Sequence, residues 1–193
     1  MPREKKYNKE EKLEQAIHLY WESGYHATSI QQLVNSLGIN RASIYDAFGS
    51  KKGLYMQTLE SYANQQTKRM ADFLYQYVNV RQGLYALFEN EINSSLNEPV
   101  KRGCFWINAT AEIANSDTEI LNQLEGIKSQ FEKVFFNYLQ YGVNQGQISS
   151  FKDVSSLVHY FLSIYSGIKT NSKLNSKATD YLNVVGIGLK ALD

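Results

Sequence analysis

Apolar residues along this chain of 193 residues recur three and four positions apart, which is the period of an amphipathic α-helix. The first stripe begins after Asn8, a residue type that caps helix N-termini and that has Glu11 three positions later. It ends before Gly24, which is typical of a helix C-terminus. Its members are Leu13, Ala16, Ile17 and Tyr20. No segment shows the sustained alternation of a β-strand, so we predict an all-α protein.

The stripes that follow predict three more helices close together. Thr28, with Gln31 at the capping-box position, is expected to cap a second helix. Asn40 is expected to cap a third, short helix, and Ser50 a fourth that covers residues 51–76. A helix of that length would extend from the first three helices into the rest of the chain.

The remaining residues continue as helices with short connections. The pattern predicts helices over residues 81–97, from about 103, from a second capping box at Ser116 and Glu119 to about 145, and over 153–170 and 176–192. We therefore divide the chain into a three-helix unit, residues 1–50, and a C-terminal helical bundle, residues 51–193. The helix at 51–76 would be shared and would couple the two mechanically.

Composition narrows the class of protein. The two prolines are too few for a turn-rich β-sandwich, and the single cysteine rules out a disulfide framework or a cysteine-based zinc site and favours a reducing compartment. The net charge of +1 excludes a protein that coats nucleic acid by its bulk charge. A local basic surface is still expected, because Lys5, Lys6, Lys51 and Lys52 gather outside an acidic first helix.

Motifs of enzymes do not occur in the chain. HExxH, GxSxG and the phosphate loop are absent, so we expect no enzyme, no bound metal and no cofactor. The first residues lack the apolar core of a secretory signal, and the longest apolar stretch, 157–168, is far shorter than the roughly 20 residues of a membrane span. We expect a cytoplasmic protein without membrane contact.

Residues 27–54 carry the informative pattern, two short helices separated by a turn that contains Gly38. This is the helix-turn-helix arrangement, in which the second helix enters the DNA major groove and its N-terminal residues meet base edges. Arg41 can pair with guanine O6 and N7, and Ala42 can approach a thymine methyl. A phosphate or solvent role for Arg41 stays open.

Hydroxyl and ammonium groups flank this helix where phosphates would pass. Ser43 and Tyr45 can donate to phosphate, although Tyr45 can equally be a core aromatic residue. Lys51 lies at the next helix N-terminus, where backbone N–H groups favour an anion. Thr28 and Ser29 are expected to hold a phosphate at the start of the second helix in the same way. Together with Asn40, Arg41 and Ala42, these are the candidate DNA-binding residues.

The same segment resembles the N-terminal domain of the TetR/AcrR family of bacterial transcriptional regulators. The resemblance covers about a quarter of the chain and includes turn, core and phosphate positions together. The residues that carry it are Gly24, Tyr25, Thr28, Ser29, Ile30, Leu33, Leu37, Gly38, Ile39, Ser43, Ile44, Tyr45, Phe48, Lys51, Leu54, Tyr55 and Leu59.

The resemblance implies a homodimer that binds a palindromic DNA operator, most often as a repressor. A small-molecule effector would enter the C-terminal bundle, shift the shared fourth helix and move the two reading heads off the operator spacing. On the family pattern Arg41 and Ala42 touch bases, and Tyr45 and Lys51 hold phosphates. Asp46 departs from the aromatic residue often found at its position, and we expect it to accept a hydrogen bond from cytosine N4.

The second half of the chain is rich in aromatic residues, as expected for a core or for the lining of a small-molecule pocket. We expect a hydrophobic or aromatic effector. The candidate ligand-binding residues are Tyr62, Phe88, Phe105, Asn108, Glu112, Phe135 and Tyr165. Asn108 and Glu112 share a helix face, and a hydrogen bond to a neighbouring helix or a place at a dimer rim is the alternative for both.

Two other interpretations remain open. Cys104 follows two basic residues near a helix N-terminus, which lowers a thiol pKa, so a redox- or electrophile-sensing repressor competes with a buried small side chain. The last two helices carry apolar residues over a wide arc and are expected to form the homodimer interface, unless they pack wholly within one chain. A ligand-binding bundle with a vestigial helix-turn-helix is the alternative function.

Overall fold

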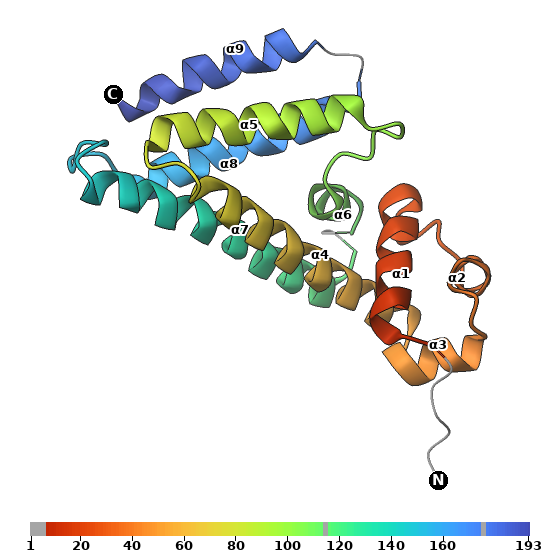
Figure 1. Ribbon diagram of the computed structural model, residues 1–193. Helices are drawn as coiled ribbons and strands as arrows, with labels where there is room; N and C mark the ends of the chain where they lie inside the picture. The colour runs from red at the N-terminus through yellow and green to blue at the C-terminus, as the bar shows by residue number, and fades with distance from the viewer. Residues whose placement is uncertain (1–6, 114–115, 175–176) are drawn as a thin grey trace.

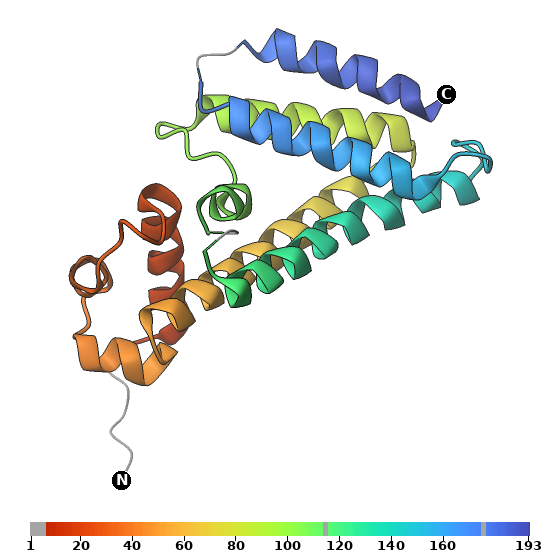
Figure 2. The same ribbon diagram turned by 180° about the vertical axis from the view of Figure 1, so that it is seen from behind.

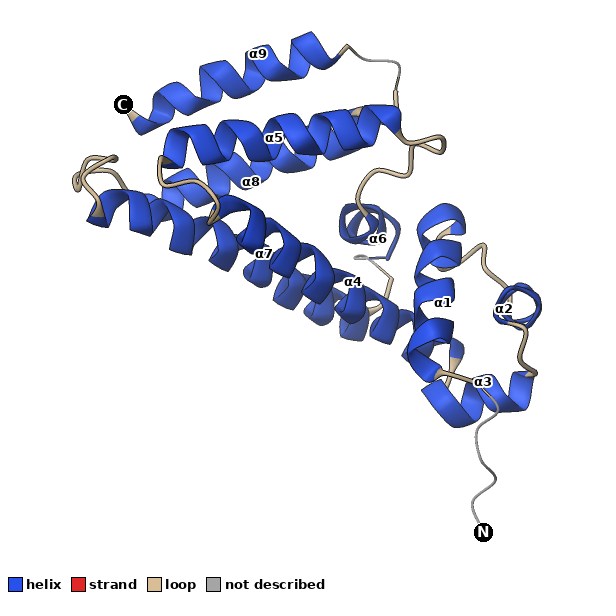
Figure 3. Ribbon diagram, viewed as in Figure 1, coloured by secondary structure: helices blue, strands red, loops and turns tan. Residues whose placement is uncertain are grey.

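The computed structural model describes residues 7–113, 116–174 and 177–193, and within these ranges the regular structure is entirely helical (Figure 3). The prediction of an all-α protein is confirmed. The α-helices are α1 (Lys9–Ser23), α2 (Ile30–Leu37), α3 (Arg41–Phe48), α4 (Lys51–Leu74), α5 (Val80–Asn97), α6 (Phe105–Ile113), α7 (Thr118–Asn144), α8 (Val154–Asn171) and α9 (Ala178–Leu189), and a 3-10 helix covers Lys190–Leu192.

Helices α1, α2 and α3 form a small group at one end of the molecule (Figure 1). Helix α4 leaves this group and runs beside α7, and both views place α5 and α8 next to each other across these two long helices (Figure 2). Helix α9 packs on α5 at the outside, and the short α6 lies between α1 and the long helices. The N-terminal unit thus contacts the bundle through α4 and α6.

Capping side chains set most helix starts where the sequence predicts them. Asn8 accepts from the backbone N–H of Glu10 at 2.9 Å, and Asn40 and Ser50 cap α3 and α4 through the N–H groups of their N3 residues. Gly24 follows α1 with φ of +78°, a conformation that glycine adopts without steric cost. The three capping side chains thus satisfy N–H groups that a helix leaves without an intrahelical partner.

Two predicted caps are wrong by one residue. The N-cap of α2 is Ser29, not Thr28, and it forms a reciprocal capping box with Gln32. Thr28 is fully buried and its hydroxyl donates to the Gly24 carbonyl at 2.6 Å, so its oxygen faces away from the helix start. Helix α7 is capped by Asp117, because the Ser116 hydroxyl donates back to the Ile113 carbonyl instead.

The first turns of α4 belong to the core of the N-terminal unit. Tyr20 of α1 and Tyr55 of α4 are fully buried and meet edge to face with ring centroids 4.9 Å apart. The Tyr20 hydroxyl donates to the Lys51 carbonyl at 3.2 Å. Leu33 and Ile44 complete this core from α2 and α3. The start of α4 is therefore packed as part of the N-terminal unit.

Aromatic residues fill the core of the bundle. Phe131 of α7 stacks on Trp106 of α6 with ring centroids 5.1 Å apart, and the Trp106 indole N–H donates to the Leu124 carbonyl. Further along, Phe88 of α5 lies 6.2 Å from Phe161 of α8, measured between ring centroids. Burial of such rings contributes several kcal/mol in total, because each fully buried side chain stabilises by about 1.5–3 kcal/mol.

We expect alanine substitutions at two helical glycines to have opposite effects on the free energy of unfolding. In Gly126→Ala nothing lies within 4 Å of the new methyl group, so the helix should gain about 0.5–1 kcal/mol. In Gly83→Ala the methyl group would collide with the Tyr138 hydroxyl, which donates to the Tyr77 carbonyl, and overpacking should cost about 1–3 kcal/mol. Urea unfolding followed by circular dichroism measures both, and a shift of the same sign in both variants would contradict this packing.

Candidate nucleic-acid interface

The turn between α2 and α3 holds the two helices of the predicted helix-turn-helix in place. Gly38 ends α2 in the left-handed conformation, with φ of +64°, and its N–H donates to the Val34 carbonyl at 3.0 Å. Leu37, Ile44 and Phe48 are buried beneath the turn. Burial of this inner face leaves the opposite edge of α3 outside.

Arg41 and Ala42 are exposed at the start of α3. The Arg41 Nε donates to the Tyr45 hydroxyl at 3.2 Å, and the guanidinium carbon lies 5.2 Å from the centre of the Tyr45 ring. Tyr45 is thus a half-buried neighbour of Arg41 rather than a core residue. Both side chains lie on the outer edge of the helix.

The remaining candidate residues on α3 have local roles as well. The Asn40 side chain accepts from the Ser43 N–H at 2.8 Å as the helix cap. Ser43 is half-buried, and its carbonyl accepts from the Tyr7 hydroxyl at 3.2 Å. Asp46 is exposed on the same helix. Two of the predicted basic residues, Lys5 and Lys6, lie outside the described residues.

The hydroxyl and ammonium groups at the starts of α2 and α4 differ in whether an outside acceptor such as a phosphate can reach them. Ser29 is exposed, and its oxygen accepts from the Gln32 N–H, which leaves the hydroxyl hydrogen for another acceptor. Thr28 offers no side chain to a phosphate because it is buried. The Lys51 ammonium lies 4.4 Å from the centre of the Tyr25 ring. Partial burial lowers the pKa of Lys51, and the nearby Glu112 carboxylate acts in the opposite direction.

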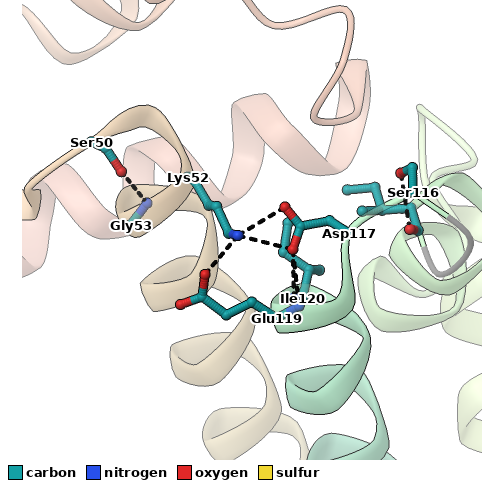
Figure 4. Close-up of polar contacts among 8 residues, drawn as sticks. Ser50, Lys52, Gly53, Ser116, Asp117, Glu119 and Ile120 are labelled. Atoms are coloured by element: carbon teal, nitrogen blue, oxygen red, sulfur yellow. Dashed lines mark hydrogen bonds and ion pairs between the residues drawn. The ribbon is translucent and has the colours of Figure 1, made fainter.

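Lys52 does not belong to the basic surface that the sequence predicts. Its ammonium lies 2.8 Å from Asp117 and 2.6 Å from Glu119, so it joins the start of α4 to the start of α7 (Figure 4). The hydrogen bond from Lys52 is the main cause that lowers the pKa of Asp117, and the hydrogen bonds to both carboxylates raise the pKa of Lys52. This pairing is not evident from the sequence, because 65 residues separate Lys52 from Asp117.

Glu112 is a second link between the bundle and the N-terminal unit. Its carboxylate accepts from the backbone N–H groups of Tyr25 and His26 at 3.1 and 2.8 Å. A Cβ at Gly24 would lie 2.7 Å from a Glu112 oxygen, so the turn after α1 needs glycine for this close approach as well as for its positive φ. Glu112 thus carries a structural contact from α6 to the turn that precedes α2.

The structure brings the predicted ligand-binding residues to different places. Phe88 and Phe135 are fully buried and stack with ring centroids 6.4 Å apart. Asn108 donates to the Arg102 carbonyl at 2.8 Å and accepts from Lys173, so its partners lie in the segments before α6 and after α8 and not in a neighbouring helix. Phe105, Asn108 and Glu112 line a cavity of about 290 Å³ beside α1.

Tyr62 and Tyr165 line a different cavity of about 420 Å³. Its walls come from α1, α4, α5, α8 and the segment between α5 and α6. Charged residues of both signs line it beside the aromatic ones, among them Arg69, Glu91 and Lys169. The sequence does not mark these charged residues as cavity-lining, because their helical pattern is also that of an exposed polar face.

Cys104 is buried, as in the alternative of a buried small side chain and unlike an exposed sensor thiol. The Tyr62 hydroxyl donates to its sulfur at 3.4 Å. Burial raises the pKa of Cys104, and the hydrogen bond from Tyr62 offsets this only in part. The expectation of a lowered pKa from the preceding basic residues is therefore wrong, since desolvation outweighs the charges nearby.

Within the described residues no cluster of three or more His, Cys, Asp or Glu side chains has the arrangement of a metal site. None of the described helices is long and apolar enough to cross a membrane.

Comparison with known proteins settles the family. The profile of the bacterial regulatory proteins of the tetR family matches residues 13–57, which include α2, the turn and α3. The profile of the tetracyclin repressor-like C-terminal domain matches residues 81–185, more than half of the chain. The chain belongs to the TetR family. Its members are transcriptional regulators and not enzymes, and the predicted resemblance is confirmed.

Individual relatives agree over the whole length. The uncharacterized HTH-type transcriptional regulator YezE of Bacillus subtilis is 26% identical over 100% of both chains, and the HTH-type transcriptional repressor ComR of Escherichia coli is 24% identical over 97% of this chain and 90% of its own. Among solved structures, a cysteine mutant of CifR in complex with 26-bp operator DNA has a TM-score of 0.88 over 99% of this chain and 100% of its own, at 22% identity.

Replacement of Glu112 should loosen the turn after α1 in this TetR-family chain. In Glu112→Ala the amides of Tyr25 and His26 lose a charged acceptor near the surface, which is worth about 1 kcal/mol, so their hydrogen exchange should accelerate about fivefold. Glu125→Ala removes an exposed carboxylate from α7 and is the matched control. Unchanged exchange at both amides would show that the contact does not hold the turn.

Proposed function

We propose that the protein is a homodimeric transcriptional repressor that binds a palindromic DNA operator and leaves it when a small-molecule effector binds the C-terminal region. In this proposal residues 1–50 form the reading head, residues 51–193 form the effector and dimerisation domain, and α4 belongs to both. The observation that carries it is the exposed start of α3, flanked by Ser29 and Lys51, on a helix-turn-helix of the family. A regulator of operator DNA acts in the cytoplasm of a bacterium.

Direct readout is assigned to the first turn of α3. Arg41 can replace its bond to Tyr45 with a bidentate contact to guanine, and Ala42 is small enough for close approach to a thymine methyl. We assign phosphate contacts to Ser29, Ser43, Tyr45 and Lys51. Asn40 is assigned to the DNA-facing surface directly before the residues that contact bases. Thr28 contributes to the position of Ser29 but offers no side chain to DNA. Asp46 is assigned to a cytosine N4 group.

A second copy of the chain is proposed to cover the outer face of α8 and α9. Tyr181, Val185 and Leu189 of α9 pack inward, yet Val184 and Ile187 are 48% and 65% exposed. A Cβ at Gly167 or Gly186 would meet nothing within 4 Å, so a partner helix can approach closely there. A four-helix interface with two helices from each subunit would bury this apolar face. The two copies of α3 should then lie roughly 34–36 Å apart.

The effector is proposed to act through the contacts that join the bundle to the reading head. Lys52 links α4 to α7, and Glu112 links α6 to the turn before α2. An effector with an apolar or aromatic body that binds better when these contacts are rearranged shifts the population away from the operator-competent shape. A shift from 1:99 to 99:1 requires a preference of about 5.5 kcal/mol.

Arg41→Ala and Lys51→Ala should weaken operator binding in different ways. Arg41→Ala should cost about 1–3 kcal/mol and relax base preference at one position, because a base contact is lost. Lys51→Ala should weaken all sequences alike and reduce the salt slope by about 1, because one phosphate contact is lost. Fluorescence anisotropy with DNA from upstream of the protein's own gene, over a salt series, measures both.

Lys68→Ala is the control, since this lysine of α4 is paired with Asp72 away from the helix-turn-helix and its loss should leave the salt slope unchanged. Wild-type affinity in both Arg41→Ala and Lys51→Ala would refute the contact assignment. Ligand binding without any salt-sensitive DNA affinity in the wild type would instead favour the bundle with a vestigial helix-turn-helix.

Ile187→Glu should convert the dimer to a monomer, because it places a charge in the centre of the proposed interface. Val78→Glu changes an even more exposed apolar residue outside α8 and α9 and should leave the dimer intact. Analytical ultracentrifugation measures the mass of each. A monomeric wild type, or a dimeric Ile187→Glu variant, would refute this interface.

A further inference from the structure

The cavity of about 420 Å³ lies where the reading head meets the bundle. Helix α1 contributes Ile17 and Trp21 to its wall, and Met70, Phe73 and Leu87 line it from α4 and α5. Its volume is within the range of about 300–1,000 Å³ for small-molecule sites, and its apolar lining can hold an organic body. A ligand there would touch α1 and the bundle at the same time.

Most charged groups on the lining already have partners within the protein. The Lys169 ammonium lies 2.5 Å from Glu91 and 2.9 Å from the Ser95 hydroxyl, and both members of the ion pair are less than one-fifth exposed. Glu14 accepts from the Gln65 amide at 3.2 Å. These groups need nothing from a ligand.

Arg102 lines the cavity from the segment between α5 and α6. Its guanidinium lies 3.1 Å from His18 and 3.6 Å from Glu22, both on α1. It therefore belongs to the contacts that hold the reading head. Glu98 is on the same segment, directly after the end of α5, and shares the rim with Arg102.

Several donors on the lining have no acceptor among the described residues, including the buried indole N–H of Trp21, and Arg69 and Tyr165 are the two considered for an anionic group. The Arg69 side chain of α4 is exposed, and its guanidinium forms no ion pair or hydrogen bond with these residues. The Tyr165 side chain of α8 is 2% exposed, and its hydroxyl has no hydrogen-bond partner. Burial raises the pKa of Tyr165 well above its ordinary value, so the hydroxyl keeps its proton and stays a donor. Both donors line the cavity without a bond to the described residues, so an acceptor on a ligand can reach them without breaking an existing contact.

We propose that this cavity binds a small organic anion with an apolar body, and that Arg69 and Tyr165 hold its anionic group. A guanidinium from α4 and a phenol from α8 on the lining of one cavity suit a carboxylate, which accepts several hydrogen bonds. The apolar body lies against Trp21, Met70 and Phe73. That the bound anion controls DNA binding rests on the proposed function. That the cavity binds the anion does not.

The test uses three probes with one apolar body and three head groups, 4-phenylbutyrate, 4-phenylbutanol and 4-phenylbutylamine. Isothermal titration calorimetry with the full chain, in the absence of DNA, gives the Kd of each. The acid should bind about tenfold more tightly than the alcohol, because only the acid offers a charged acceptor to both donors. Arg69→Gln and Tyr165→Phe should each abolish most of this difference while the Kd of the alcohol stays the same.

Matched controls separate the site from general effects. Lys68→Gln removes the neighbouring positive charge, which is paired with Asp72 outside the cavity. Tyr181→Phe removes a buried tyrosine hydroxyl that has no partner, on α9 and away from the lining. Both controls should retain the preference for the acid.

Three outcomes would overturn the proposal. They are failure of the acid to bind at millimolar concentration, tighter binding of the amine than of the acid, and an unchanged preference in both Arg69→Gln and Tyr165→Phe. DNA affinity measured in parallel without probe tests the proposed function separately, because the acid can bind a chain that recognises no operator. If both hold, the acid should lower the DNA affinity of the wild type but not of Arg69→Gln.

Discussion

Helix α4 is part of two cores, and this constraint organises the molecule. Its first turns are buried against α1 through the contact between Tyr20 and Tyr55, and its later turns pack on α5 and α7. A continuous hydrogen-bonded helix transmits a tilt from one end to the other, since protein interiors are close-packed and do not absorb displacement freely. The contacts of Glu112 and Lys52 add two polar links beside this rigid one.

Local patterns in the sequence were sufficient to predict the helices of this fold. The apolar stripe between Asn8 and Gly24 and the caps at Asn40 and Ser50 depend on residues within one or two turns of each other, so they can be read without tertiary knowledge. The errors at Thr28 and Ser116 arose where two hydroxyl-bearing or polar residues are adjacent. Which of the two turns toward the helix depends on burial, and burial is decided by the rest of the fold.

The candidate site was predictable only in part for the same reason. Arg41 and Ala42 lie on a helix edge whose exposure follows from the apolar residues opposite to them. Lys52 and Glu112 could not be assigned, because their partners are 65 and more than 80 residues away along the chain. Phe88 and Phe135 were predicted to line a ligand pocket but lie in the core. An aromatic residue on an inward face has the same sequence pattern whether it lines a cavity or fills a core.

The ion pair between Glu91 and Lys169 has a consequence for how this protein can diverge. Loss of one member would strand a desolvated charge at a cost of several kcal/mol, whereas replacement of both by apolar residues of similar size is often neutral. Single substitutions at either position should therefore be rare among its descendants, and the two positions should change together. Sequence covariation between α5 and α8 would then record a contact across 78 residues of chain.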